Sequence, residues 1–340
     1  MKSFKLIYKC MATIAILFTL MIVFSSSSEA SSSTFTSVNF GTRSYSIFVP
    51  SNYVPGQPTP LVVMIHGCLQ DADDFMIGTQ MNQIAERENF IVIYPEQNPR
   101  YNDMRCWNFF EPANQRRGSG EPQVIVDMVN HVSANFTIDA NAVFAAGLSS
   151  GGALTASLGV LYPDVFTAIS VNAGLSHQAG INSLTGVSAM FYAIPTINPV
   201  LAANNAFNAL PANARRVVPT IVFHGTFDTV VNPLNGDHVV TQMLTFNGRS
   251  DATINIFNRT LRTGNARVSN GRTYSVESFR DRSGRVVIEH HRVNLMGHDW
   301  SGGHAAGSHT DPRGPNASEA IWQFFRNARA LMLSTQESHK

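Results

Sequence analysis

The stretch VFAAGLSSGGAL, residues 143–154, decides the expected fold class. An apolar, β-branched run leads into Gly147-Leu148-Ser149-Ser150-Gly151, and a helical pattern follows. This is the G-x-S-x-G pattern between a strand and a helix, which holds a serine hydroxyl out on a sharp, strained turn. Glycines two residues to either side of Ser149 prevent clashes in such a turn. A Ser/Gly turn without chemistry is the alternative, but the flanking strand and helix favour a nucleophile.

On both sides of this turn, short apolar runs alternate with longer helical patterns. The strand candidates are residues 44–49, 61–66, 91–94, 143–146, 168–172, 220–224 and 286–293. The helix candidates lie near residues 74–88, 121–135, 150–162, 236–247 and 317–333, and the last begins with a capping-box-like Asn316-Ala-Ser-Glu319. Strands that alternate with helices predict an α/β fold with a mostly parallel sheet flanked by helices.

The composition is that of a globular chain. The sequence has 340 residues, of which 44% are hydrophobic and 14% charged, and its formal net charge is +1. Without a basic excess, neither a nucleic acid nor an anionic membrane is expected as a partner. We expect one catalytic domain over residues 31–340, acting as a monomer. Residues 176–216, rich in Asn and Ala, are a candidate insertion over the active site.

The N-terminus is typical of an export signal. Three lysines in MKSFKLIYK precede the uncharged apolar core MATIAILFTLMIVF, and small residues follow at Ser28 and Ala30. We therefore expect a signal peptide over residues 1–30 and a secreted or periplasmic mature chain without a membrane anchor. The apolar core is shorter than the roughly 20 residues of a membrane-spanning helix, and an uncleaved anchor is the alternative.

A serine nucleophile needs a base, and the base needs an acid to orient it. With this type of turn, the chain order is Ser, then Asp or Glu, then His. Asp228 follows the predicted strand PTIVF, at the sheet edge where open α/β sheets place their sites. Asp237 is its competitor, but it falls at the start of the next predicted helix, where a cap or a solvated role is expected.

His298 is the candidate base. It lies just beyond the strand-like run VVIEHHRVNLM, is flanked by glycine, and comes third in the chain after Ser149 and Asp228. The other histidines nearby have simpler interpretations. A Gly-rich loop carries two that we expect at the surface, and one at a strand end has the pattern of a hydrogen-bonded structural residue: His304, His309 and His224.

The reaction also needs backbone N–H groups that face the developing oxyanion. One comes from the residue after the nucleophile, which is Ser150. The other comes from the loop HGCLQ after an earlier strand, where the amide of Cys68 is the leading candidate and that of Leu69 the fallback.

The cysteines predict a disulfide and not a metal site. Cys10 lies in the leader, so an exported chain retains Cys68 and Cys106, for which only one pairing exists. A plain buried thiol remains the alternative. The chain has no CxxC or HExxH motif, and His290-His291 lie in a strand-like run that turns adjacent side chains to opposite faces. We expect neither a metal nor a cofactor.

Two tryptophans are candidate walls of the substrate pocket. Trp107 lies in CWNFF, and Trp300 comes two residues after the candidate base. Core packing is the alternative for both. Aromatic walls suit an aliphatic polyester, a ferulate ring or stacked sugars.

Together these motifs resemble the family of secreted polyhydroxybutyrate depolymerases and the related feruloyl and acetylxylan esterases. The matching stretches occur in family order: IHGCLQDADDF, RCWNFFEP, QRRGSGEP, GLSSGGALT, VFHGTFDTVVNPLNG and GHDWSGGHAAGSHTDPRGPNASEAIWQFF. The resemblance implies an α/β-hydrolase fold, esterase activity, and triad roles for Ser149, Asp228 and His298.

This sequence departs from the family pattern in two ways. Asp299 replaces a small residue beside the candidate base, where a carboxylate can perturb the pKa of the base. No linker and separate binding domain of the kind common in depolymerases of crystalline polymer is evident, which favours amorphous polymer, oligomers or smaller esters. A feruloyl or acetylxylan esterase is the main alternative function, and a serine peptidase or a noncatalytic binding protein of the same fold is less favoured.

Overall fold

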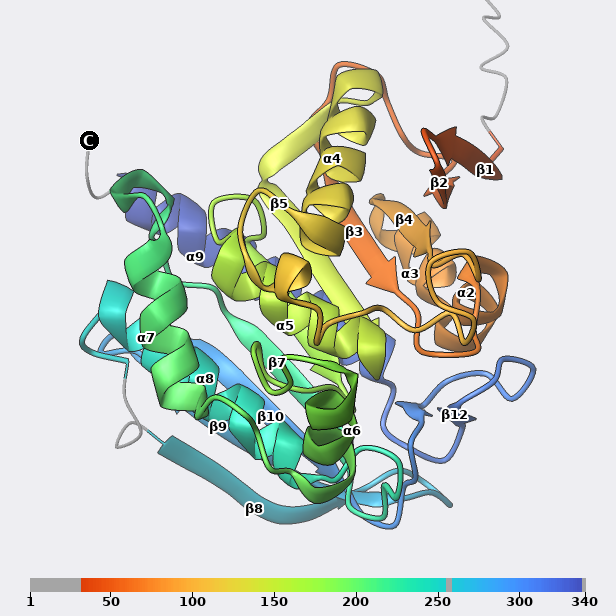
Figure 1. Cartoon of the computed structure of the whole chain (residues 1–340). Coiled ribbons are helices and arrows are strands. Elements are labelled where there is room, and N and C mark those ends of the chain that lie inside the picture. Colours follow the sequence, from red (N-terminus) through yellow and green to blue (C-terminus); the bar gives the residue numbers. More distant parts are fainter. Residues whose placement is uncertain (1–31, 255–258, 338–340) are drawn as a thin grey trace, which may run out of the picture. The chain divides into compact units, whose positions relative to one another are not determined.

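The computed structural model describes residues 32–254 and 259–337, and its centre is a ten-stranded sheet (Figure 1). The strand order is β1-β2-β4-β3-β5-β6-β7-β10-β9-β8. The strands are β1 (Thr34–Phe40), β2 (Arg43–Val49), β3 (Thr59–Ile65), β4 (Ile91–Glu96), β5 (Ile138–Leu148), β6 (Ala168–Asn172), β7 (Thr220–Gly225), β8 (Arg259–Arg267), β9 (Thr273–Arg280) and β10 (Val286–Val293); β11 (Trp300–Ser301) and β12 (Thr310–Asp311) form a separate pair. The predicted signal peptide lies outside the described residues.

The middle of the sheet is parallel, as the sequence predicted. β4, β3, β5, β6, β7 and β10 pair in parallel, while β1, β2, β9 and β8 extend the two edges with antiparallel pairs. Parallel strands covered by helices on both faces are nearly continuous apolar runs, and LVVMI in β3 is fully buried.

Helices cover both faces of this sheet (Figure 1). The helices are α2 (Ala72–Thr79), α3 (Met81–Glu88), η1 (Pro112–Gln115), α4 (Gly120–Asn135), α5 (Ser150–Leu161), α6 (Ser183–Tyr192), α7 (Pro199–Ala209), η2 (Ala212–Ala214), α8 (Leu234–Ser250) and α9 (Ala317–Glu337). One core cluster joins the sheet to α4, α5, α7 and α8, and a second joins its other face to α2, α3 and α9. In β3, Val63 belongs to the first cluster and Val62 to the second, because side chains alternate along a strand.

Several elements differ from the sequence prediction. The helix expected near residues 74–88 is divided at Gln80, which has left-handed backbone angles and caps α2. The edge strands β1, β8 and β9 were not predicted, since they are polar or only partly buried and lack continuous apolar runs. Residues 176–216, the candidate insertion, contain α6 and α7, of which α7 packs into the first core cluster. Asn316 does cap α9, accepting a hydrogen bond from the Glu319 amide at 3.0 Å.

The turn between β5 and α5 is held by direct backbone packing. Ser149 has φ 58° and ψ −121°, a strained conformation for a residue with a side chain. A Cβ on Gly147 would lie 2.6 Å from Thr155 Oγ1, and one on Gly151 would collide with the carbonyl oxygens of Ile65 and His66. The N-terminus of α5 therefore rests on the C-terminal end of β3, and only glycine allows that approach.

We predict that Gly151→Ala destabilises the protein by about 3 kcal/mol or more, because the new methyl group meets rigid backbone of β3. Gly159→Ala is the matched control in the same helix, since its Cβ would meet the Ile169 Cδ1 atom at 2.6 Å, at the end of a side chain that can move. Urea unfolding followed by circular dichroism measures both. Equal loss of stability in the two variants would contradict this account of the turn.

Candidate active site

A cavity of about 440 Å³ opens at the C-terminal edge of the parallel strands. Ser149 follows β5, Asp228 follows β7 and His298 follows β10. Ser149 and His298 both line this cavity. Its remaining walls are mostly apolar or aromatic, and they include Leu69, Met104, Trp107, Phe109, Phe110, Leu175, Val187, Met190, Phe191 and Val230.

Ser149 lines the cavity, and 7% of its surface is exposed. Its backbone N–H donates to the Asn172 carbonyl at 2.9 Å, which ties the strained turn to the end of β6. α5 begins at the next residue, so its unpaired amides and the positive end of its dipole lie beside the hydroxyl. The arrangement suits a nucleophile whose attack on a carbonyl group creates negative charge on the carbonyl oxygen.

Asp228 and His298, far apart in the sequence, meet in the structure. His298 Nδ1 lies 2.8 Å from Asp228 Oδ2, while Asp228 Oδ1 accepts from the amides of Val230 and Val231 at 2.9 Å each. Burial acts to raise the pKa of Asp228, but hydrogen bonds from His224 and His298 outweigh it, and the pKa lies well below the usual value. An ionised Asp228 accepts a hydrogen bond from the Nδ1–H group of His298 and leaves Nε2 free to act as a base.

A second histidine, His224, contacts the same carboxylate. Its Nε2 lies 3.3 Å from Asp228 Oδ2 and 2.9 Å from the Val231 carbonyl. Both neighbours are acceptors, so Nε2 carries a proton and donates to them. The sequence suggested a structural histidine and missed this contact. The spacing His224-x-x-x-Asp228 at the end of a strand was the available signal, because a tight turn brings Asp228, four positions further on, back toward His224.

The competing residues lie elsewhere or have other roles. Asp237, in the first turn of α8, pairs with Arg292 and lies 3.6 Å from His290 Nδ1. His309 is exposed, as expected, but it also lines the cavity, with its ring centroid 6.0 Å from that of His298. Asp299 is partly buried, and its burial, together with the neighbouring Asp311, raises its pKa.

Cys68, on the loop after β3, lines the cavity. The Leu69 amide, our fallback for the oxyanion site, instead donates to the Met104 carbonyl at 2.7 Å. Within the loop, Gln70 Oε1 accepts a hydrogen bond from the Gly67 amide at 2.9 Å. His66 Nε2 accepts from the Gln97 amide at 3.1 Å, so its Nδ1 holds the proton and donates to the Gly67 carbonyl at 2.7 Å. These bonds hold the loop in place.

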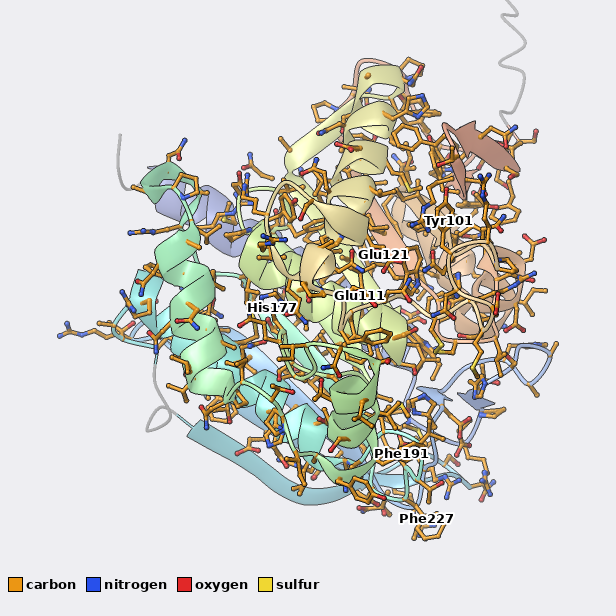
Figure 2. The ribbon with its side chains drawn as sticks, in the orientation of Figure 1. Tyr101, Glu111, Glu121, His177, Phe191 and Phe227 are labelled. Atoms are coloured by element: carbon orange, nitrogen blue, oxygen red, sulfur yellow. A yellow bond between two sulfur atoms is a disulfide. The ribbon has the colours of Figure 1, made fainter. Side chains whose placement is uncertain are left out.

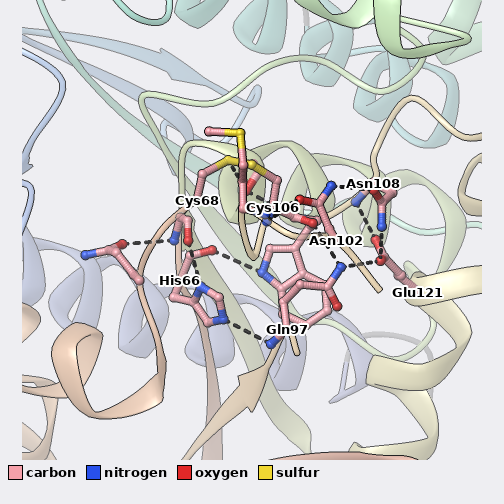
Figure 3. Close-up of a disulfide and its surroundings, with 12 residues drawn as sticks. His66, Cys68, Gln97, Asn102, Cys106, Asn108 and Glu121 are labelled. Atoms are coloured by element: carbon pink, nitrogen blue, oxygen red, sulfur yellow. Dashed lines mark hydrogen bonds between the residues drawn. A yellow bond between two sulfur atoms is a disulfide. The ribbon is translucent and has the colours of Figure 1, made fainter. Parts of the chain in front are cut away.

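The predicted disulfide is present between Cys68 and Cys106 (Figure 3). It joins the loop after β3 to the segment that carries Trp107. Ser150 Oγ lies 3.4 Å from Cys68 Sγ and accepts from the Trp107 amide at 3.3 Å. Both candidate oxyanion residues, Cys68 and Ser150, therefore contact one another through their side chains.

A buried carboxylate supports the Cys106 segment from below (Figure 3). Glu121, at the start of α4, accepts from the Asn108 amide at 2.7 Å and from Gln97 Nε2 at 2.7 Å. Gln97 also donates to the Cys106 carbonyl at 2.9 Å. Burial raises the pKa of Glu121 against the effect of these donors. Glu121 lies in the stretch QRRGSGEP, whose resemblance to the family now has a physical reason.

The two tryptophans have different roles. Trp107 is buried, lines the cavity, and donates from Nε1 to the His66 carbonyl at 3.1 Å. Trp300 corrects our expectation of a pocket wall. It is 1% exposed, belongs to the second core cluster against Phe75, and donates from Nε1 to Ser318 Oγ at 3.1 Å.

Across the described residues, no group of three or more His, Cys, Asp or Glu side chains could hold a metal ion. In the same part of the chain, no helix is long and apolar enough to cross a membrane.

Comparison with known proteins identifies the family of this chain. The family model "Esterase PHB depolymerase" matches residues 43–268, which include the loop after β3, the turn at Ser149 and the segment up to Asp228. The chain belongs to that family.

Among curated relatives of this esterase PHB depolymerase family member, poly(3-hydroxyalkanoate) depolymerase C of Paucimonas lemoignei is 30% identical over 62% of this chain and 51% of its own. Feruloyl esterase B of Neurospora crassa is 32% identical over 53% of this chain and 64% of its own. Probable acetylxylan esterase A of Neosartorya fischeri is 31% identical over 57% of this chain and 53% of its own. The chain thus spans about half to two thirds of the length of these relatives.

The solved acetyl xylan esterase from Aspergillus awamori superposes with a TM-score of 0.67, over 86% of this chain and 99% of its own, at 22% identity. That likeness concerns the fold, and it confirms the expected α/β-hydrolase architecture.

We predict that Cys68→Ala/Cys106→Ala lowers the free energy of unfolding by roughly 3–4 kcal/mol, because the bridge joins residues separated by 38 positions and restricts the unfolded chain. Urea unfolding of both proteins, with and without dithiothreitol, measures the difference. Reductant should destabilise the parent and leave the variant unchanged. A parent protein that already titrates with free thiols at Cys68 and Cys106 would be inconsistent with the bridge.

Because two histidines are buried, we predict that the free energy of unfolding falls in mild acid. Burial lowers the pKa of His66 to about 4 and that of His177 to about 4, against about 6.5 in an unfolded chain. Between these values only the unfolded chain binds the proton, so stability is greatest above about pH 6.5 and falls toward pH 4, by up to about 1.4 kcal/mol per pH unit for each histidine.

Unfolding curves at several pH values test this dependence. His177→Gln and, separately, His66→Gln should each flatten the slope of the unfolding free energy against pH. His304→Gln, on an exposed loop, controls for the substitution itself. An unchanged slope in both buried-site variants would exclude these histidines as its source.

Proposed function

We propose that the protein is a secreted serine esterase that hydrolyses ester bonds of polyhydroxybutyrate-type polyesters or their oligomers. The hydrogen bond between His298 and Asp228, at a cavity that Ser149 also lines, is the observation that carries this proposal. Family membership supports ester hydrolysis, and one relative is named poly(3-hydroxyalkanoate) depolymerase C.

In the proposed mechanism, Ser149 Oγ attacks the ester carbonyl carbon while His298 Nε2 takes the hydroxyl proton. Asp228 orients the ring and stabilises the imidazolium. The amides of Cys68 and Ser150 donate to the oxyanion of the tetrahedral intermediate. Its collapse breaks the bond to the alcohol oxygen, which receives the proton from His298. Water then repeats the sequence on the acyl-enzyme and releases the acid. The described residues form no Ser149–His298 hydrogen bond, and such bonds often tighten only when substrate binds.

The chemistry of the cavity supports an aliphatic acyl chain. Its lining contains no Asp, Glu, Lys or Arg, and its titratable groups are His298 and His309. Aromatic and aliphatic side chains provide most of the surface, among them Trp107, Phe109 and Phe110. A short uncharged chain with regularly spaced esters gains from contact with such walls, while a charged acyl group would lose its hydration without a partner.

A feruloyl or acetylxylan esterase is the second candidate. The relatives named feruloyl esterase B and probable acetylxylan esterase A support it, and the ring of Phe109 or Trp107 could pack against a ferulate ring. Both candidates use the same proposed triad and differ in the group that enters the cavity. Export rests on the predicted signal peptide and agrees with the Cys68–Cys106 disulfide, which persists in oxidising compartments.

We predict that Ser149→Ala folds normally and loses hydrolysis of p-nitrophenyl butyrate by about 10⁴-fold or more. Circular dichroism and urea unfolding verify the fold, and stopped ester assays measure the rate. Clearing of amorphous polyhydroxybutyrate is compared with release of ferulate and acetate from xylan. Residual activity near that of the parent would exclude Ser149 as nucleophile, and activity on xylan alone would favour the second candidate.

A further inference from the structure

Helix α6 exposes its large apolar side chains. Leu184, Val187 and Phe191 have i, i+3 and i+7 spacing, which places them on one face, and they are 78%, 48% and 45% exposed. The residues that α6 buries are small, namely Gly186 and Ala189. A surface helix normally has the reverse arrangement, with its large apolar residues toward the core. The outer face of α6 is therefore unlike an ordinary solvated helix.

Other exposed apolar side chains continue this surface around the cavity mouth. Phe227 is 66% exposed on the loop after β7, and that loop is joined to α6 by a hydrogen bond of 2.8 Å from the Asn232 amide to the Met190 carbonyl. Figure 2 shows Phe191 and Phe227 at the same end of the protein. We define the apolar rim as Leu69, Met104, Leu184, Val187, Phe191 and Phe227, four of which also line the cavity.

Charge is absent from the side of the rim that α6 provides. Residues 165–214 contain no Asp, Glu, Lys or Arg, although they include α6 and α7 on the protein surface. On the other side, Met104 lies between the exposed Asp103 and Arg105, and Arg105 pairs with Asp71 at 3.1 Å and with Glu96 at 3.4 Å. The α6 side of the rim thus offers apolar contact without charge, and the exposed charge beside Met104 is a carboxylate, which does not attract an anionic surface.

We propose that the apolar rim docks this domain onto the surface of a solid, uncharged aliphatic polyester, so that chain segments enter the cavity from the surface on which the protein rests. This inference rests on the proposed esterase function. It adds that the catalytic domain itself provides the adsorbing surface, and that the rim sets the preference for insoluble over soluble esters.

Continuity with the cavity favours this partner. Four rim residues have one part in the cavity lining and another part exposed, so the surface that touches the solid leads directly to Ser149. Exposed apolar patches of this kind are typical of interaction sites. Amphipathic helices that bind anionic membranes carry Lys and Arg beside their apolar face, which α6 does not. The rim is also mainly aliphatic, whereas polysaccharide surfaces are usually bound by stacked aromatic rings and hydrogen bonds.

Adsorption and turnover are measured separately to test the rim. The probe is amorphous polyhydroxybutyrate particles, with soluble p-nitrophenyl butyrate as the reference substrate. Leu184→Gln/Phe227→Gln changes two rim residues that do not line the cavity. Val54→Gln is the matched control, since Val54 is 45% exposed and lies near Thr137, toward the opposite edge of the sheet. Ser149→Ala provides a background in which adsorption is measured without hydrolysis.

The rim variant should adsorb to the particles at least about tenfold more weakly and hydrolyse them correspondingly slowly, while its rate on the soluble ester stays within about twofold of the parent. Val54→Gln should resemble the parent in both assays. Adsorption by the rim variant equal to that of the parent overturns the proposal. A loss of adsorption that is confined to xylan particles or to phospholipid vesicles also overturns the proposal. The same holds if sedimentation shows a concentration-dependent dimer of the parent that the rim variant alone fails to form. Failure of the esterase proposal can be told apart from failure of the rim proposal. In that case the parent would not hydrolyse the soluble ester, whether or not it adsorbs to the particles.

Discussion

The contact between Gly151 and the last carbonyl groups of β3 is the constraint on which the site depends. It brings the N-terminus of α5 against the strand end that continues into the loop with Cys68. The turn at Ser149 and the start of the loop at Cys68 are therefore packed against each other, and a shift of one displaces the other. The disulfide and the contacts of Ser150 Oγ secure this packing from the side of the Cys106 segment. A strained serine persists because its surroundings leave the backbone no alternative.

The acid end of the site shows how a buried charge is kept ionised. Asp228 is removed from water, which disfavours its charged form, but two backbone amides and two imidazoles donate to its oxygens. At Glu121, near the disulfide, an amide N–H and amide side chains also donate to a buried carboxylate, but there the effect of burial prevails and the pKa is raised. In both places the hydrogen bonds fix the position of the carboxylate, and a buried carboxylate left without donors would be costly.

At the mouth of the cavity, the distribution of buried and exposed apolar side chains differs from that in the rest of the fold. The two core clusters bury large apolar side chains against the sheet, whereas α6 turns Leu184 and Phe191 outward and Gly186 inward. Residues that break the usual pattern of buried apolar and exposed polar side chains are concentrated at functional sites. The placement of α6 beside the cavity is consistent with a surface kept for a partner and not for the stability of the monomer.

Local sequence signals were sufficient for the central elements of this protein. Some features could be recognised because they depend on neighbouring residues or on chain order. They are the apolar run before Gly147, the glycines around Ser149, the order of Ser149, Asp228 and His298, and the single cysteine pair. Other features depend on which distant segments meet. Trp300 turned into the core, His224 joined Asp228, and α6 exposed its apolar face, since side-chain direction follows from packing between elements that periodicity along the chain does not encode. The sequence therefore indicated the candidate triad, while long-range packing set the walls and the mouth of the cavity that Ser149 and His298 line.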